Sequence, residues 1–151
     1  MTNPQLSPRL SPQPTQADLK DFFLKDRFAA HVGIELLEMA PGRAKAKLAI
    51  HDHHRNAVGV VHGGAIFSLA DLVFAVASNS HGTVALGINV SISYMTAARG
   101  GTLVAEAEEV SINPKLATYL IRILDDEETL IALFQGTVYR KREALPVAEH
   151  L

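Results

Sequence analysis

Residues 60–78, "VVHGGAIFSLADLVFAVAS", decide the fold of this chain. After Gly64, apolar residues lie on all sides of the predicted helix rather than along one stripe. Because such a helix has to be buried on every side, we expect other elements, from this chain and from a second copy of it, to surround it. One carboxylate, Asp71, lies in the middle of this helix, and charged side chains are rarely buried without a partner.

The composition indicates one globular domain without a nucleic-acid or membrane partner. The chain has 151 residues, 48% of them hydrophobic, and a formal net charge of -2. This length suits one domain, the charge provides no basic field for nucleic acid or an anionic membrane, and the mostly apolar stretch 64–77 is too short to span a bilayer. The chain contains no cysteine, so a cysteine nucleophile is excluded and we expect a reducing, cytoplasmic location.

The first half of the chain predicts a tail, a helix and a hairpin. We expect a disordered proline-rich tail at 1–16, a single domain at 17–142 and a flexible C-terminal tail at 143–151. Apolar periodicity predicts an amphipathic helix at 18–30, with Asp18 as its cap or first-turn acid. Two strands joined at Pro41-Gly42 follow, and a histidine-rich loop then leads into the long helix.

The second half of the chain is strand-like. In residues 84–94 six apolar residues alternate with small or polar ones, which predicts a strand with those six on one face. Further strands are predicted at 102–112, 116–124 and 129–139. We expect the four strands to form an antiparallel meander. The fold class is therefore α+β, with a sheet that covers the long helix and a second subunit that covers the rest of it.

His62, Gly63 and Gly64 stand where the long helix begins. The first N–H groups of a helix lack intrahelical acceptors and carry partial positive charge. They can therefore stabilise a carbonyl oxygen that becomes negative during acyl transfer. A tight turn would explain the two glycines equally well.

Asp71 is the candidate catalytic base. A carboxylate among apolar side chains is desolvated, which raises its pKa into a range that suits a general base. The alternative is a structural Asp satisfied by Ser68 and Ser78, which share roughly its face, or by a cation at an interface. Gly63 lies about 12 Å from Asp71 along the axis, too far for both to act on one carbonyl group. Two antiparallel helices from two subunits would bring the two groups together.

The stretches "NAVGVVHGGAIFSLAD" (56–71) and "YMTAARGGTLVAEAEEV" (94–110) strongly resemble the hot-dog-fold acyl-CoA thioesterases, in particular the branch named after the phenylacetate-degradation thioesterase. The resemblance covers about residues 28–140. It implies a hot-dog fold, in which a curved antiparallel sheet wraps a long helix, and homodimers that usually pair into homotetramers. It also implies hydrolysis of an acyl-CoA to a free acid and CoA without a metal or redox cofactor.

The resemblance also implies roles for single residues. The amide of Gly63, with Gly64 beside it, would polarise the thioester carbonyl, and Asp71 of the facing subunit would activate water or attack directly. Asn56 would hold the water or the substrate, and His62 would orient the loop or contact the thioester.

The resemblance is weaker for the residues that would hold the CoA phosphates. Arg99 and Lys115 are the suggested cations, although for each residue taken alone a solvated surface charge is the favoured explanation. Relatives often have Thr or Ser near the start of the long strand, where this chain has Gly87, which leaves the rate and the choice of substrate open.

We expect Phe67, Leu72 and Phe74 to line the acyl pocket and Ser68 to contact the substrate, which favours an aromatic or medium-length acyl group on CoA or on an acyl carrier protein. Two alternatives remain: a hot-dog dehydratase or hydratase that uses His62 and Asp71 as its acid and base, and a non-catalytic acyl-CoA-binding sensor. The loop before the long helix also contains three histidines and one aspartate: His51, Asp52, His53 and His54. Two imidazoles of this loop can face the same way, but no third well-spaced metal ligand accompanies them, so we expect no metal.

Overall fold

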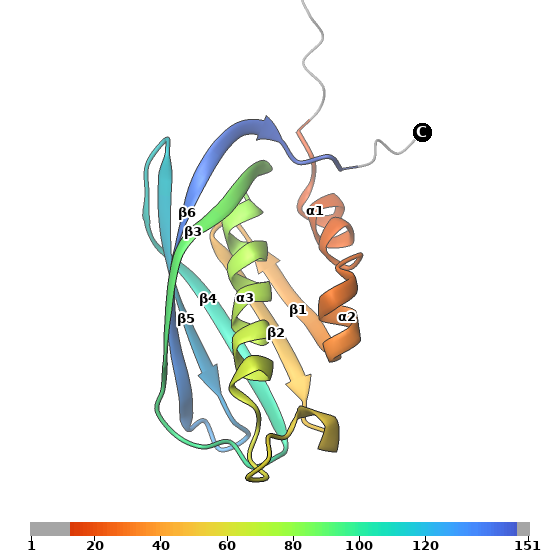
Figure 1. The fold of residues 1–151 in the computed structure, drawn as a ribbon. Coiled ribbons are helices and arrows are strands. Elements are labelled where there is room, and N and C mark those ends of the chain that lie inside the picture. Colours follow the sequence, from red (N-terminus) through yellow and green to blue (C-terminus); the bar gives the residue numbers. More distant parts are fainter. Residues whose placement is uncertain (1–12, 148–151) are drawn as a thin grey trace, which may run out of the picture.

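The long helix α3 (Gly63–Asn79) lies in the concave face of a six-stranded antiparallel sheet (Figure 1). The computed structural model describes residues 13–147, and the outer parts of the two expected tails, 1–12 and 148–151, lie outside the described residues. None of the helices within 13–147 is long and apolar enough to cross a membrane. The α+β hot-dog arrangement expected from the sequence is confirmed.

The sheet has the strand order β1-β2-β4-β5-β6-β3. Its strands are β1 (Ile34–Ala40), β2 (Arg43–Ala49), β3 (Thr83–Tyr94), β4 (Thr102–Ile112), β5 (Leu116–Leu124) and β6 (Leu130–Ala144). The predicted four-strand meander is therefore wrong, because β3 pairs with β6 and β4 pairs with β2. The helix separates β2 from β3, and residues 95–101 then cross back past the start of α3 to place β4 beside β2 (Figure 1).

The predicted helix at 18–30 is two helices. Helix α1 (Gln16–Phe23) begins at a capping box of Thr15 and Asp18, and α2 (Arg27–Val32) begins where the Asp26 side chain accepts a hydrogen bond from the Ala29 N–H. A capping side chain at Asp26 satisfies the first amides of a new helix, which breaks the run that periodicity suggested. Both helices lie beside β1 (Figure 1), and α2 also contacts α3.

The last strand, which was expected to end at residue 139, is longer than predicted. Strand β6 runs to Ala144, and the buried Leu145 donates its backbone N–H to the Gly82 carbonyl. Residues 143–145, which were expected in the flexible tail, thus belong to the fold and close over the turn that follows α3.

Small side chains let α3 approach the sheet closely. Alternate residues of β2 and β4 point at the helix and are buried, and several are alanines: Ala44, Ala46, Ala105 and Ala107. On the helix, Leu69, Ala70, Val73, Val76 and Ala77 are fully buried. We infer that burial of this helix face provides much of the stability of the fold.

Strand β3 does not present its six apolar residues on one face, as was predicted. Its register shifts between Gly87 and Asn89. Leu86 therefore pairs with the exposed Tyr139, whereas Val90 pairs with Gly136, on the opposite face of β6. A bulge inserts one residue and so reverses the faces of the residues on either side of it.

The ring of Phe74 explains two glycines of the sheet. A Cβ atom added at Gly136 would lie 2.6 Å from ring carbons of Phe74, and one added at Gly87 would lie 3.1 Å from the same ring. Gly87 therefore makes room for the ring of Phe74.

We expect Gly136→Ala to lower the free energy of unfolding by about 1–3 kcal/mol, because overpacking forces a well-packed core to shift. Urea denaturation measures this change. The control is Gly100→Ala, whose added Cβ would meet only the end of the Arg55 side chain at 3.4 Å. Combining Gly136→Ala with Phe74→Leu should restore part of the lost free energy of unfolding, because the smaller side chain makes room for the added Cβ atom. Equal unfolding midpoints for Gly136→Ala and for Gly100→Ala would contradict this explanation.

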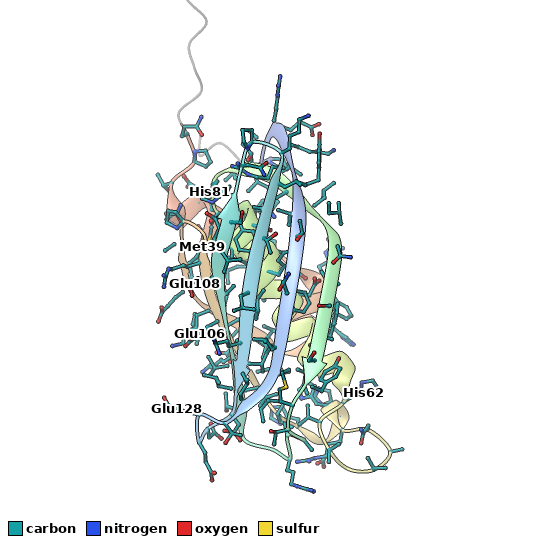
Figure 2. The ribbon with its side chains drawn as sticks, turned by 90° about the vertical axis from the view of Figure 1, so that its left-hand side faces the viewer. Met39, His62, His81, Glu106, Glu108 and Glu128 are labelled. Carbon is teal, nitrogen blue, oxygen red and sulfur yellow. The ribbon has the colours of Figure 1, made fainter. Side chains whose placement is uncertain are left out.

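A polar cluster closes the C-terminal end of α3, far from His62, which lies near the opposite end of the sheet (Figure 2). Tyr119 Oη and His81 Nε2 both donate to Glu109 Oε2, at 2.5 and 2.7 Å. Burial alone would raise the pKa of Glu109, but the hydrogen bonds from Tyr119 and His81, aided by the charges of His81 and Arg140, hold this pKa below its ordinary value. The carboxylate of Glu109 therefore stabilises the fold at neutral pH.

We expect Glu109→Gln to lower the free energy of unfolding by about 1–2 kcal/mol at pH 7, because neutral hydrogen bonds replace charged ones. The difference should shrink as the pH falls through the lowered pKa of Glu109, where the wild-type carboxylate also becomes protonated. Urea melts at pH 7 and pH 3 measure this change. The control, Glu108→Gln, removes an exposed ion pair with Arg43 and should change little; a loss that is equal at both pH values would contradict the assignment.

Candidate active site

The N-terminus of α3 leaves one backbone donor free. His62 caps the helix: its Nδ1 accepts a hydrogen bond from the Gly64 N–H at 2.8 Å, and its carbonyl accepts one from the Ala65 N–H at 3.0 Å. Within residues 13–147 the Gly63 N–H has no acceptor. Gly63, and not Gly64, is therefore the donor available to a ligand.

Close approach of other groups explains the two glycines, which begin the helix and do not form a turn. A Cβ atom at Gly63 would lie 3.2 Å from the Tyr94 ring, and one at Gly64 would lie 3.0 Å from His62 Nδ1. Since Nδ1 of His62 accepts a hydrogen bond, the neutral ring carries its proton on Nε2.

The loop before α3 is held by its own hydrogen bonds. His54 is buried, with Nδ1 accepting from the His51 N–H and Nε2 donating to the Val32 carbonyl at 2.6 Å. The His54 carbonyl in turn accepts from the His62 N–H at 2.7 Å. This histidine therefore positions the start of α3, and within the described part of the chain no group of three or more His, Cys, Asp or Glu residues is arranged to hold a metal.

Asn56 presents its amide NH₂ group. Its Oδ1 accepts hydrogen bonds from the Val58 and Val60 N–H groups at 3.1 and 3.2 Å. The Nδ2 group has no acceptor within residues 13–147. This arrangement fixes the side chain through its oxygen and leaves the two N–H donors for a water or a substrate.

Asp71 lies in a cavity of about 640 Å³ on the uncovered side of α3. Although part of its side chain is exposed, the surrounding protein partly desolvates the Asp71 carboxyl group, and this desolvation raises its pKa above the ordinary value; the charge of Asp26 across the cavity raises the pKa further. The hydrogen bonds that the alternative, structural interpretation of Asp71 requires are not formed: Ser68 Oγ donates to the Gly64 carbonyl at 2.7 Å and Ser78 Oγ to the Ala75 carbonyl at 3.2 Å. The cavity is lined by Asp26, Phe28, Ala29, Gly64, Phe67, Ser68, Asp71, Leu72, Ala75 and Tyr94.

A second cavity of about 490 Å³ adjoins Asp71 on the other side and is bounded by the edge strand β3. Phe74, Ser78 and Gly87 are among the residues that line it. Leu86, Ile88 and Val90 on β3 are exposed, as is Asp71 itself. The sequence predicts that α3 is buried on every side. In a single chain, however, one stripe of the helix is uncovered, and this stripe contains Asp71.

The structure separates the two suggested phosphate-binding cations. Arg99 lies beside the start of α3: the Val61 N–H donates to the carbonyl of its neighbour Ala98 at 2.9 Å, and the Arg55 guanidinium donates to the Arg99 carbonyl. Lys115 lies in the turn at the other end of β4, about 33 Å away along the strand. One chain cannot bring both to the same phosphate group.

Among the lining residues of the Asp71 cavity that were not predicted as site residues, three carry polar or aromatic side chains: Asp26, Phe28 and Tyr94. Asp26 and Phe28 fall inside what periodicity suggests is one continuous helix, so no local signal distinguishes them. Tyr94 ends the alternating strand and looks like one more apolar residue of it. Only the packing of α2 and β3 around α3 brings these three together.

Comparison with known proteins agrees with the fold. Residues 58–132 match the thioesterase superfamily. A protein of Archaeoglobus fulgidus is 51% identical over 85% of this chain and 84% of its own length, and the acyl-coenzyme A thioesterase PaaI of Escherichia coli is 32% identical over 76% and 83%.

Solved structures of PaaI proteins superimpose on the fold. The E. coli PaaI protein, from the phenylacetic acid degradation operon, has a TM-score of 0.81 and 29% identity, covering 85% of this chain and 94% of that one. A variant of the phenylacetic acid degradation protein PaaI of Thermus thermophilus has a TM-score of 0.74 and 34% identity, covering 77% and 100%.

We expect Asp26→Asn to lower the pKa of Asp71 while the fold is kept, because asparagine caps a helix as well as aspartate does and only the neighbouring charge is lost. Burial still acts on Asp71, so its pKa should remain above the ordinary value. Titration of the Asp71 carboxyl carbon by NMR measures the change. Asp21→Asn, on the exposed side of α1, is the matched control, and an unchanged Asp71 pKa in Asp26→Asn would contradict the coupling.

Proposed function

Because the chain belongs to the thioesterase superfamily, we propose that it hydrolyses an acyl-CoA to a free acid and CoA, with Asp71 and the Gly63 amide as its two main catalytic groups. The observation that carries this proposal is the pair of unsatisfied groups on α3, a free backbone donor at Gly63 and a carboxylate without a hydrogen-bonding partner in the described chain at Asp71. A donor for a developing oxyanion and a base are the requirements of thioester hydrolysis.

A homodimer completes this site in the proposal. Gly63 and Asp71 lie about 12 Å apart on one helix, so they serve different sites. The uncovered stripe of α3 lies beside the edge strand β3, since Asp71 and Ala75 share a cavity with residues 85–90 of that strand. If two such faces meet about a twofold axis, Asp71 faces the partner subunit's Gly63, and the dimer contains two equivalent sites.

In the reaction, the Gly63 N–H binds the thioester oxygen as it becomes negative. Asp71 of the facing subunit acts in its unprotonated form, either as the base that activates water or as the nucleophile. The free NH₂ group of Asn56 holds the water or the substrate. His62 orients the loop through its bond to the Gly64 N–H, so Gly64 itself donates nothing to the oxyanion.

The acyl group and the CoA occupy different parts of the surface. The cavity walls Phe28, Phe67 and Leu72 suit an aromatic or medium-length acyl chain. Arg99 lies at the same end as Gly63 and is the candidate for the CoA phosphates. Lys115 can serve this site only from another subunit, because it lies at the opposite end of β4.

A tetramer is supported by the outer face of the sheet (Figure 2). The face carries ion pairs over β1, β2 and β4, where Glu106 and Glu108 lie. Over β5, β6 and β3 its paired residues are largely uncharged, including Thr118 with Thr137 and Leu120 with Gln135. We propose that this uncharged half packs against a second dimer, since interface cores are depleted of charge.

We expect Asp71→Asn to lower hydrolysis by at least about 10²-fold, the low end of general-base contributions. Thiol release from phenylacetyl-CoA, benzoyl-CoA and straight-chain acyl-CoAs measures this, with Asp21→Asn as the control. Activity of the wild type should also fall with decreasing pH through the raised pKa of Asp71, above the ordinary range for aspartate.

Two results would contradict the proposal. Full activity of Asp71→Asn would remove Asp71 from the chemistry. Binding of intact acyl-CoA with no thiol release by the wild type would favour an acyl-CoA sensor, and hydration or dehydration of an enoyl-CoA would favour a hot-dog hydratase.

A further inference from the structure

Tyr94 lies against the backbone that carries the free amide. It ends β3, opposite Ala132 of β6, and its hydroxyl donates to the Gly63 carbonyl oxygen at 3.1 Å. Its Cζ and Oη atoms would be 3.2 Å from a Cβ atom at Gly63. The tyrosine ring thus leaves little room for a side chain at residue 63, and its hydroxyl holds the first carbonyl of α3.

The start of α3 needs such support. Two consecutive glycines have more backbone freedom than any other pair of residues, and the first turn of a helix frays readily. His62 holds the Gly64 N–H, but within residues 13–147 nothing accepts a hydrogen bond from the Gly63 N–H. An oxyanion donor is effective only when its direction is set before the reaction.

We propose that Tyr94 is the positioning residue that fixes Gly63 for catalysis; this inference rests on the proposed role of the Gly63 amide. His62 holds the residue that follows Gly63, and Tyr94 holds Gly63 itself through its carbonyl. A tyrosine hydroxyl has a single hydrogen to donate, and Gly63 accepts it, so Tyr94 acts through Gly63 and does not protonate the leaving thiolate.

The position of Tyr94 supports a functional role over a structural one. Its side chain is 51% exposed, and a hydrogen bond made at the surface adds little to stability. It also lines the cavity that contains Asp71. The tyrosine therefore connects edge strand β3, which the proposed dimer covers, with the helix N-terminus that binds the thioester oxygen.

The test compares Tyr94→Phe with Tyr139→Phe, which removes the hydroxyl of a half-exposed tyrosine on β6. We expect kcat of Tyr94→Phe to fall about tenfold with KM within about twofold, because an oxyanion donor acts in the transition state and not in ground-state binding. Tyr139→Phe should match the wild type. An unchanged kcat in Tyr94→Phe, or a change in KM alone, would overturn the proposal.

A second measurement separates this inference from the proposed function. In protein labelled with ¹⁵N-glycine, Tyr94→Phe should shift the Gly63 amide resonance and speed its exchange with solvent, whereas Tyr139→Phe should leave both unchanged. An unchanged Gly63 amide overturns the role of Tyr94 even if acyl-CoA is hydrolysed. If the wild type hydrolyses no acyl-CoA, the proposed function and the catalytic role of Tyr94 both fail, whereas an altered Gly63 amide would still show that Tyr94 fixes the helix start.

Discussion

The packing of α3 into the concave face of the sheet is the contact on which the rest of the structure depends. Small side chains on β2 and β4, such as Ala46 and Ala105, let the helix lie close to the strands. Because the sheet covers the helix from one side only, a stripe through Asp71 is left beside the free edge of β3. The same packing thus stabilises the chain and leaves the carboxylate uncovered.

The two ends of α3 differ in how completely their polar groups are satisfied. At the C-terminal end, Asn79 exchanges hydrogen bonds with the Ala85 backbone, Ser80 accepts from the Gly42 N–H, and Glu109 binds His81 and Tyr119. At the other end, the Gly63 N–H and the Asn56 amide NH₂ have no acceptor among residues 13–147. The hydrogen bonds that stabilise the helix ends are therefore concentrated at the C-terminal end, whereas the N-terminal end has donors left for a ligand. Polar groups without a partner are expected at functional sites.

The N-terminal helices and β3 add residues to the site from opposite sides of α3. Asp26 caps α2 and at the same time raises the pKa of Asp71, so one carboxylate both supports a helix and acts on the proposed catalytic group. Tyr94 comes from the far end of β3 and contacts Gly63. The geometry around the free amide therefore depends on elements that are distant in sequence.

The sequence by itself determined the long helix, the extents of most strands and the helix start at His62-Gly63-Gly64, because periodicity and helix-end chemistry are local properties; it also made Asp71 the candidate catalytic residue. Its resemblance to hot-dog thioesterases added the fold class and the reaction class. Only the tertiary structure decided that β3 pairs with β6, that Asp26 begins a second helix, that Asp26, Phe28 and Tyr94 share a cavity with Asp71, and that Arg99 and Lys115 lie apart. Strand neighbours and cavity walls are set by contacts between distant residues, and alternation along one strand carries no information about which strand lies beside it.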